Sequence, residues 1–169
     1  GNAALLKHAS NVPGCALAIE KIIIDAGFPP GLFRALLVPG SQVKPIIQHP
    51  LVRAVTLTGS TPAGQTVAAQ AGAVLKKTVL ELGGSDPHLV LEDADLDHAA
   101  ATCVQSRLIN TGQSCIAAKR FIVLPSVLRE YTERFLTLMR GKTMGDPLAP
   151  ADPINQAPDL GPLARPDLR

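Results

Sequence analysis

The stretch Val52-Arg-Ala-Val-Thr-Leu-Thr-Gly-Ser-Thr-Pro-Ala-Gly64 decides the fold. Its first half predicts a β-strand. Ser60 is then a favourable N-cap and Pro62 suits the first turn of a helix, which small residues extend to about Ala73. A further strand is predicted over Lys77–Leu82. Strand, turn, helix and strand form the unit from which parallel sheets are built.

The same alternation continues toward the N-terminus. Residues 3–7 and 32–38 predict strands, and residues 14–26 and 43–49 predict helices. For the first helix, Ser10 or Asn11 is the expected cap and Gly27 the expected stop, and its almost wholly apolar composition predicts that it is largely buried. The alternating order predicts an α/β fold with a parallel, doubly wound, Rossmann-like sheet.

A second group of elements follows Gly83-Gly84. Strands are predicted over 88–91 and 119–123, a helix over 96–109 and an amphipathic helix over 126–140. The side chains expected to face inward are Leu96, Ala99, Ala100, Cys103, Val127, Tyr131, Phe135 and Leu138. After Gly145 the periodicity ends and prolines accumulate, so a loose tail is expected.

Composition excludes several classes of protein. A net charge of +2 and an aromatic content of 3% give no basis for nucleic-acid binding. The three cysteines show no paired spacing, which argues against a disulfide framework or a metal site and favours a reducing, cytoplasmic setting. No apolar run reaches membrane-spanning length and no signal peptide opens the chain. Because the first residue is Gly rather than Met, we expect an internal fragment of a longer protein.

Two short motifs suggest covalent chemistry. Cys115 ends the polar, glycine-containing stretch Asn110-Thr-Gly-Gln-Ser-Cys115, and Glu81 stands in Leu80-Glu-Leu-Gly-Gly84. A thiol in such a loop can attack a carbonyl, and a carboxylate from another loop can activate water to release the product. A lone cysteine is more often a small buried hydrophobe, which is what we expect of Cys15 and Cys103, but the polar neighbours of Cys115 argue against that for this residue.

Together, Glu-Leu-Gly-Gly and Asn-x-Gly-Gln-x-Cys resemble the aldehyde dehydrogenase superfamily. Two segments are most similar to the succinate-semialdehyde dehydrogenase type: Glu81-Leu-Gly-Gly-Ser-Asp-Pro87 and Cys115-Ile-Ala-Ala-Lys-Arg120. The resemblance implies that residues 1–84 are the second part of an NAD(P)-binding domain and that residues 85–169 begin a catalytic domain. It also implies a small-molecule aldehyde substrate and a homo-oligomeric full-length enzyme, with no role for nucleic acid or a membrane.

The resemblance assigns two catalytic residues. Cys115 would be the nucleophile, with its backbone N–H as an oxyanion donor in a loop shaped by Gly112 and Gln113, and Glu81 would be the general base for deacylation. Transfer of the thioester to coenzyme A instead of water is the alternative reaction, against which Glu81 argues. A different class of function is also open: a truncated, non-catalytic chain that acts only by packing or by weak nucleotide binding.

The resemblance also places the coenzyme, NAD or NADP. Thr58, Gly59 and Ser60 would lie at the pyrophosphate, although alone this turn is an ordinary helix cap. Lys7 matches the lysine that binds the adenosine ribose or a 2′-phosphate. Ser10 stands where many NAD enzymes have Glu, so NADP is as plausible as NAD. The backbone of Leu82-Gly83 would lie against the nicotinamide.

One departure concerns the substrate. Ile109 stands where succinate-semialdehyde enzymes often have an Arg that pairs with the far carboxylate, and Arg107 is the nearest arginine. A displaced Arg is not equivalent, because a bidentate contact with a carboxylate is directional. We therefore expect succinate semialdehyde to be accepted together with uncharged aldehydes.

Overall fold

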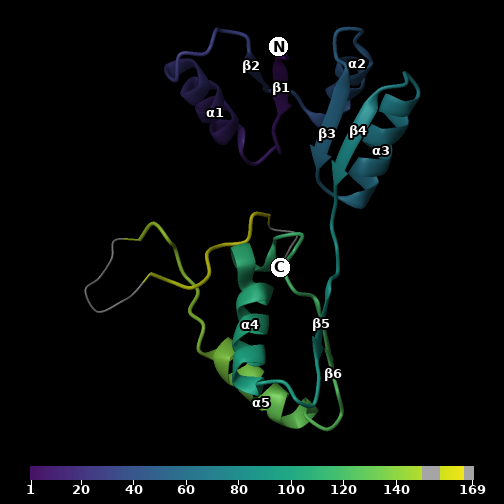
Figure 1. Cartoon of the computed structure of the whole chain (residues 1–169). Coiled ribbons are helices and arrows are strands. Elements are labelled where there is room, and N and C mark those ends of the chain that lie inside the picture. The colour runs from purple at the N-terminus through teal and green to yellow at the C-terminus, as the bar shows by residue number, and fades with distance from the viewer. Residues whose placement is uncertain (150–156, 166–169) are drawn as a thin grey trace. The chain divides into compact units, whose positions relative to one another are not determined.

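The computed structural model describes residues 1–149 and 157–165. These form two compact units, Gly1–Leu82 and Gly83–Arg169 (Figure 1). The first unit contains β1 (Ala4–Lys7), α1 (Pro13–Asp25), β2 (Phe33–Leu36), the 3-10 turn Gly40–Gln42, α2 (Val43–Gln48), β3 (Ala54–Thr58), α3 (Thr61–Gly72) and β4 (Lys77–Glu81). The second contains β5 (Pro87–Val90), α4 (Leu96–Leu108), the 3-10 turn Ile109–Gly112, β6 (Arg120–Val123) and α5 (Leu128–Arg140).

The strands pair two by two. β1 lies beside β2, β3 beside β4 and β5 beside β6, and every pair is parallel. Each pair is joined through at least one helix, as parallel strands require. The predicted α/β class with parallel strands is therefore confirmed.

The β3–α3–β4 unit has the predicted construction. Ser60 is the N-cap of α3 and its hydroxyl accepts a hydrogen bond from the Ala63 N–H at 3.4 Å. Gly64, in the first turn of α3, lies so close to Leu82 that an added Cβ would come within 2.7 Å of a Leu82 methyl. The small residues thus let the helix approach the end of the strand closely.

Helix α1 ends as predicted but begins differently. Its C-terminus is a Schellman motif: Gly27 has a φ of +86°, and the Phe28 N–H donates to the Ile23 carbonyl at 3.3 Å. Its N-cap is Val12, with no side-chain capping bond, so the expectation that Ser10 or Asn11 would cap it is wrong. The helix begins at Pro13, which is favoured at the first helical position and moves the cap past both polar residues.

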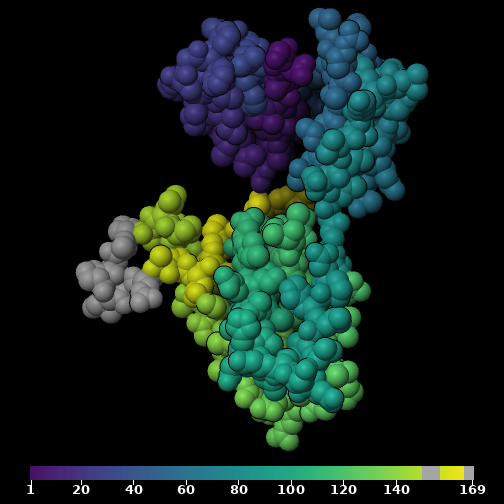
Figure 2. Space-filling model, viewed as in Figure 1, coloured from purple at the N-terminus to yellow at the C-terminus, as the bar shows by residue number. Residues whose placement is uncertain are grey.

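The expected burial of α1 is also wrong. Ala16 is its only buried residue, Ile22 is 64% exposed, and Cys15, expected to be a packing residue, is exposed. The segment of this helix, dark blue in Figure 2, lies at the surface of the first unit. The reason is the narrow neighbouring sheet: two strands of four residues cover one side of a thirteen-residue helix at most.

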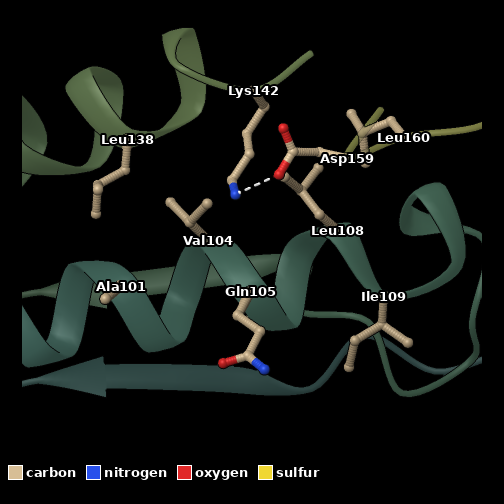
Figure 3. A pocket seen from close by; sticks show the side chains of 9 residues that line it. All are labelled: Ala101, Val104, Gln105, Leu108, Ile109, Leu138, Lys142, Asp159 and Leu160. Carbon is tan, nitrogen blue, oxygen red and sulfur yellow. Dashed lines mark hydrogen bonds and ion pairs between the residues drawn. The ribbon is translucent and has the colours of Figure 1, made fainter. Parts of the chain in front are cut away.

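The core of the second unit follows the predicted faces of its helices. Val90, Ala100, Cys103 and Tyr131 are buried together, with Phe121 and Phe135 packed against them. Helices α4 and α5 lie side by side next to the β5–β6 pair (Figure 1). Leu138 departs from the prediction, being 39% exposed at the edge of a cavity of about 370 Å³ beside α4 (Figure 3).

The segment after α5 is anchored where the structure describes it. The Asp159 carboxylate accepts a hydrogen bond from the Lys142 ammonium at 2.8 Å (Figure 3). It also accepts from the Thr143 N–H and hydroxyl at 3.0 Å each. The Gly145 N–H donates to the Leu160 carbonyl. These bonds join residues 142–145 to residues 159–160, the looseness of the tail stays a prediction, and residues 150–156 and 166–169 of that tail lie outside the described residues.

No helix in the part of the chain that the structure describes has both the length and the apolar character needed to cross a membrane.

Candidate active site

The loop that carries Cys115 is conformationally strained. We call residues 109–119, between α4 and β6, the nucleophile loop. Asn110, Thr111 and Gly112 follow one another in the left-handed region, with φ of 49°, 57° and 75°. Glycine adopts this region freely, but a β-branched threonine there costs on the order of 1–3 kcal/mol. Backbone strain of this kind persists only where the surroundings hold it, and it is concentrated at functional sites.

Cys115 itself is open to a ligand. It lies in a tight turn that the Ala117 N–H closes by donating to the Ser114 carbonyl at 3.1 Å, and its thiol is exposed. Its own N–H donates no hydrogen bond to any residue in 1–149 or 157–165. A thiol and an unpaired backbone donor on one residue can act on the carbon and the oxygen of the same carbonyl group.

Two cationic side chains hold the carbonyl groups of the nucleophile loop. Arg107, in the last turn of α4, donates to the Gly112 carbonyl at 2.6 Å and to the Ala118 carbonyl at 2.5 Å. Lys119 donates to the carbonyls of Cys115 at 2.9 Å and Ala117 at 3.2 Å. Four carbonyls around the thiol are therefore held by cationic side chains of the same unit, while the Cys115 N–H donates to no residue that the structure describes.

Gln113 fastens the loop to a distant segment. Its side-chain amide donates to the Asn110 carbonyl at 3.0 Å and accepts from the Ala164 N–H at 2.8 Å. The expected part of Gln113 in shaping this loop thus has a physical basis.

Sequence reasoning missed the contacts of Arg107 and Lys119. From the sequence, Arg107 is only a displaced candidate partner for a substrate carboxylate, whereas in the structure its guanidinium donates to two backbone carbonyls. A signal for this contact was present. An arginine in the last turn of a helix is well placed to bind unpaired carbonyls beyond the helix end, and a glycine-containing loop follows directly.

In the first unit, the other predicted catalytic residue lies beside the predicted pyrophosphate turn. Thr58 and Glu81 are direct partners at the carboxyl ends of β3 and β4, and the Gly59 N–H donates to the Glu81 carbonyl at 2.9 Å. The Glu81 carboxylate is exposed and has no partner among the described residues. This edge is where ligands bind in parallel α/β sheets.

The turn fits a phosphate group. The N–H groups of Ser60 and Thr61 make no hydrogen bond with any described residue, and they stand at the N-terminus of a twelve-residue helix. Unpaired N–H groups and the positive end of a helix dipole attract anions.

The remaining predicted coenzyme residues lie in several places. Lys7 is half-buried at the end of β1, opposite Leu36, and Ser10 is exposed in the turn that follows. The side chain of Leu82 packs against α3, and Gly83 is open. Four of the predicted site residues therefore lie together at one sheet edge: Thr58, Gly59, Ser60 and Glu81. Lys7 and Ser10 lie at the end of the β1–β2 pair, and Cys115 lies in the second unit. In residues 1–149 and 157–165, no group of three or more His, Cys, Asp or Glu side chains could hold a metal ion.

The chain resembles known proteins over nearly its whole length. It is 53% identical over 164 residues to the succinate-semialdehyde dehydrogenase [NADP(+)] of Mycobacterium avium, covering 97% of this chain and 34% of that protein. It is 52% identical over 168 residues to a probable succinate-semialdehyde dehydrogenase [NADP(+)] of Synechocystis, covering 99% and 36%. Among solved structures, the succinic semialdehyde dehydrogenase of Streptococcus pyogenes in complex with NADP+ matches with a TM-score of 0.85 and 39% identity, over 92% of this chain and 34% of that one.

This chain therefore spans about a third of the length of the relatives it matches. The profile of the aldehyde dehydrogenase family matches residues 1–168. The chain belongs to the aldehyde dehydrogenase family.

Proposed function

We propose that this chain supplies the nucleophile, the deacylating base and part of the coenzyme site of an NADP+-dependent aldehyde dehydrogenase. The observation that carries the proposal is the state of Cys115: an exposed thiol beside an N–H that pairs with no described residue, in a strained loop where Arg107 and Lys119 hold four carbonyl groups. Membership of the family supports it, and so does the free carboxylate of Glu81 beside an anion-binding turn.

The Cys115 thiolate attacks the aldehyde carbon, and the developing alkoxide accepts a hydrogen bond from the Cys115 N–H. When bound, the nicotinamide coenzyme accepts the hydride that leaves this carbon, and Cys115 is then acylated as a thioester. Glu81 takes a proton from a water molecule while the oxygen of that water attacks the thioester carbon. The C–S bond breaks, the carboxylic acid leaves and the thiolate is restored.

For the coenzyme, the chain offers an anion site and a suitable charge pattern. The turn of Thr58, Gly59 and Ser60 would bind the pyrophosphate, and Lys7 and Ser10 would lie near the adenosine ribose. Two features support NADP+ over NAD+. The relatives from Mycobacterium avium and Synechocystis are named as NADP+ enzymes, and Ser10 places no negative charge where a 2′-phosphate would lie.

For the substrate, we propose succinate semialdehyde with weak discrimination against uncharged aldehydes. The names of the relatives support the semialdehyde. Ile109 cannot pair with a carboxylate, and the Arg107 guanidinium already donates to two carbonyls. The test compares kcat/KM for succinate semialdehyde and butanal. We expect a modest preference, and a preference of about 10⁴ or more would reveal a dedicated carboxylate clamp that we have missed.

The proposal as a whole is tested in the complete enzyme, by which we mean a full-length aldehyde dehydrogenase that carries these 169 residues. One way to obtain it is to replace the matching third of the Mycobacterium avium relative. On mixing with aldehyde and NADP+, the complete enzyme should form NADPH, and Cys115→Ser should form none because the thioester cannot arise. Cys103→Ser, which changes a buried thiol in the core of the same unit, is the matched control and should retain turnover. NADPH formation by Cys115→Ser at the wild-type rate would refute the proposal.

A further inference from the structure

We infer that Arg107 is a positioning residue for the thiol of Cys115, which it serves by fixing both ends of residues 112–118, the part of the nucleophile loop that carries the thiol. The inference rests on the proposed role of Cys115 as nucleophile. Gly112 and Ala118 stand three residues before and three residues after Cys115, and the one guanidinium donates to the carbonyls of both. The distance between the two ends of the loop is thereby set by a rigid planar group.

The surroundings of this contact favour a specific function over a chance surface bond. Arg107 is half-buried, and Ala118, which it binds, is fully buried. The Ala118 N–H also donates to the Ser106 carbonyl at 3.2 Å, so that end of the loop is tied to α4 twice. Without Arg107, the Ala118 carbonyl would be buried without this charged donor, and charge-assisted bonds of this kind are stronger than neutral ones.

The other end of the loop needs Arg107 because it is strained. Three successive left-handed residues end at Gly112, whose carbonyl is held by the guanidinium. A Cβ at Gly112 would overlap the Arg107 guanidinium, so glycine both suits the left-handed conformation and leaves room for this side chain. Removing Arg107 would allow these left-handed residues to relax, and the thiol, three to five residues further along the chain, would move.

Lys119 does not duplicate this function. It is exposed and donates to the carbonyls of Cys115 and Ala117, both inside the turn that carries the thiol. Arg107 instead joins the two ends of the loop. A lysine at position 107 would present a single point charge without the fork that reaches two carbonyls at once, so Arg107→Lys should restore activity only in part.

The test uses Arg107→Ala and Arg107→Lys in the complete enzyme, with Arg134→Ala and Arg134→Lys as matched controls. Arg134 is an apt control because it is also a half-buried arginine of the second unit with two partners, in its case the carboxylates of Asp97 on α4 and Glu130 on α5. The readouts are the rate of the first NADPH turnover, the KM for aldehyde, and the rate at which iodoacetamide alkylates Cys115 in folded protein.

We expect Arg107→Ala to slow the first turnover by about 100-fold with little change in KM, because misplacement of a reacting group by about 1 Å can cost that much. Arg107→Lys should slow the first turnover less than Arg107→Ala does. Added guanidinium ion at millimolar concentration should restore part of the first-turnover rate of Arg107→Ala. Both Arg134 variants should keep the first turnover within about threefold of wild type. A first turnover within threefold of wild type in Arg107→Ala, or an equal loss in Arg134→Ala, would overturn the inference.

A second pair of variants and a second measurement decide the inference where the first comparison fails. If Arg107→Ala does not fold, the comparison of Arg107→Lys with Arg134→Lys decides in the same way. The alkylation rate of Cys115 needs no turnover, so an altered rate in the Arg107 variants with an unaltered one in the Arg134 variants supports positioning independently of the reaction. If the wild-type complete enzyme oxidises no aldehyde, the proposed function fails, whereas a normal wild type with unaffected Arg107 variants defeats this inference alone.

Discussion

At the scale of single residues, the two predicted catalytic groups share one property: neither side chain is engaged by another residue in the part of the chain that the structure describes. The Glu81 carboxylate and the Cys115 thiol are both exposed, whereas the backbone around each is fixed by hydrogen bonds. The Gly59 N–H binds the Glu81 carbonyl, and Lys119 binds the Cys115 carbonyl. Free reactive atoms on a fixed backbone are the preorganised arrangement that catalysis needs.

A residue-scale prediction concerns coenzyme choice. In the complete enzyme, Ser10→Glu should weaken NADP+ more than NAD+, because a carboxylate near the 2′ position repels a phosphate and can accept from a ribose hydroxyl. The ratio of the two dissociation constants measures this directly. Ser41→Glu, on the 3-10 turn that follows β2, adds the same charge elsewhere in the first unit and should leave the ratio unchanged. An unchanged ratio in Ser10→Glu would mean that this residue does not face the ribose.

At the scale of elements, the end of α5 is joined to the segment 157–165 by Asp159. Its hydrogen bond with Lys142, followed by those with Thr143, lowers the pKa of this carboxyl from 3.8 to about 2. A carboxyl whose pKa is lowered in the folded state stabilises it fully above its unfolded pKa. The contribution of Asp159 is therefore complete above about pH 4 and is lost as the pH falls through 2.

This contact predicts a measurable shift. In the 169-residue chain, Lys142→Met should raise the pKa of Asp159 back toward 3.8, as followed by a carbon NMR titration of the aspartate side chains, because the Lys142 hydrogen bond is the first cause of the lowering. Lys44→Met, on α2 of the first unit, is the control and should leave Asp159 unchanged. An Asp159 pKa that stays near 2 in Lys142→Met would show that Thr143 alone holds the carboxylate.

At the scale of the whole molecule, the order of strands and helices is predictable from the sequence, whereas the burial of their side chains is less so. The strand and helix order and the cap at Ser60 follow from local patterns, because those patterns report backbone preferences of a few adjacent residues. The exposure of α1 and Cys15 could not be predicted in that way, since burial depends on how many distant segments cover a surface.

The candidate site shows the same division. Cys115, Glu81 and the turn at Thr58 were recognisable because each is carried by a short motif. The contacts of Arg107 and Lys119 were not, because they depend on the path of a loop that passes through three left-handed residues, two of them not glycine. Such a path is set by tertiary contacts against the local preference of Thr111, so the sequence can indicate that Arg107 binds carbonyls beyond the helix end but not which carbonyls they are.

The central claim is that Cys115 is acylated and that Glu81 is needed only to release the acyl group. Glu81→Gln in the complete enzyme should therefore form its first NADPH at close to the wild-type rate and then turn over slowly. Acid quenching during that slow phase, followed by peptide mass spectrometry, measures where the acyl group is held. The account predicts an acyl thioester on the peptide that contains Cys115, and none on Cys15 or Cys103. An acyl group on another residue, or a Glu81→Gln enzyme that loses the first turnover as well, would contradict it.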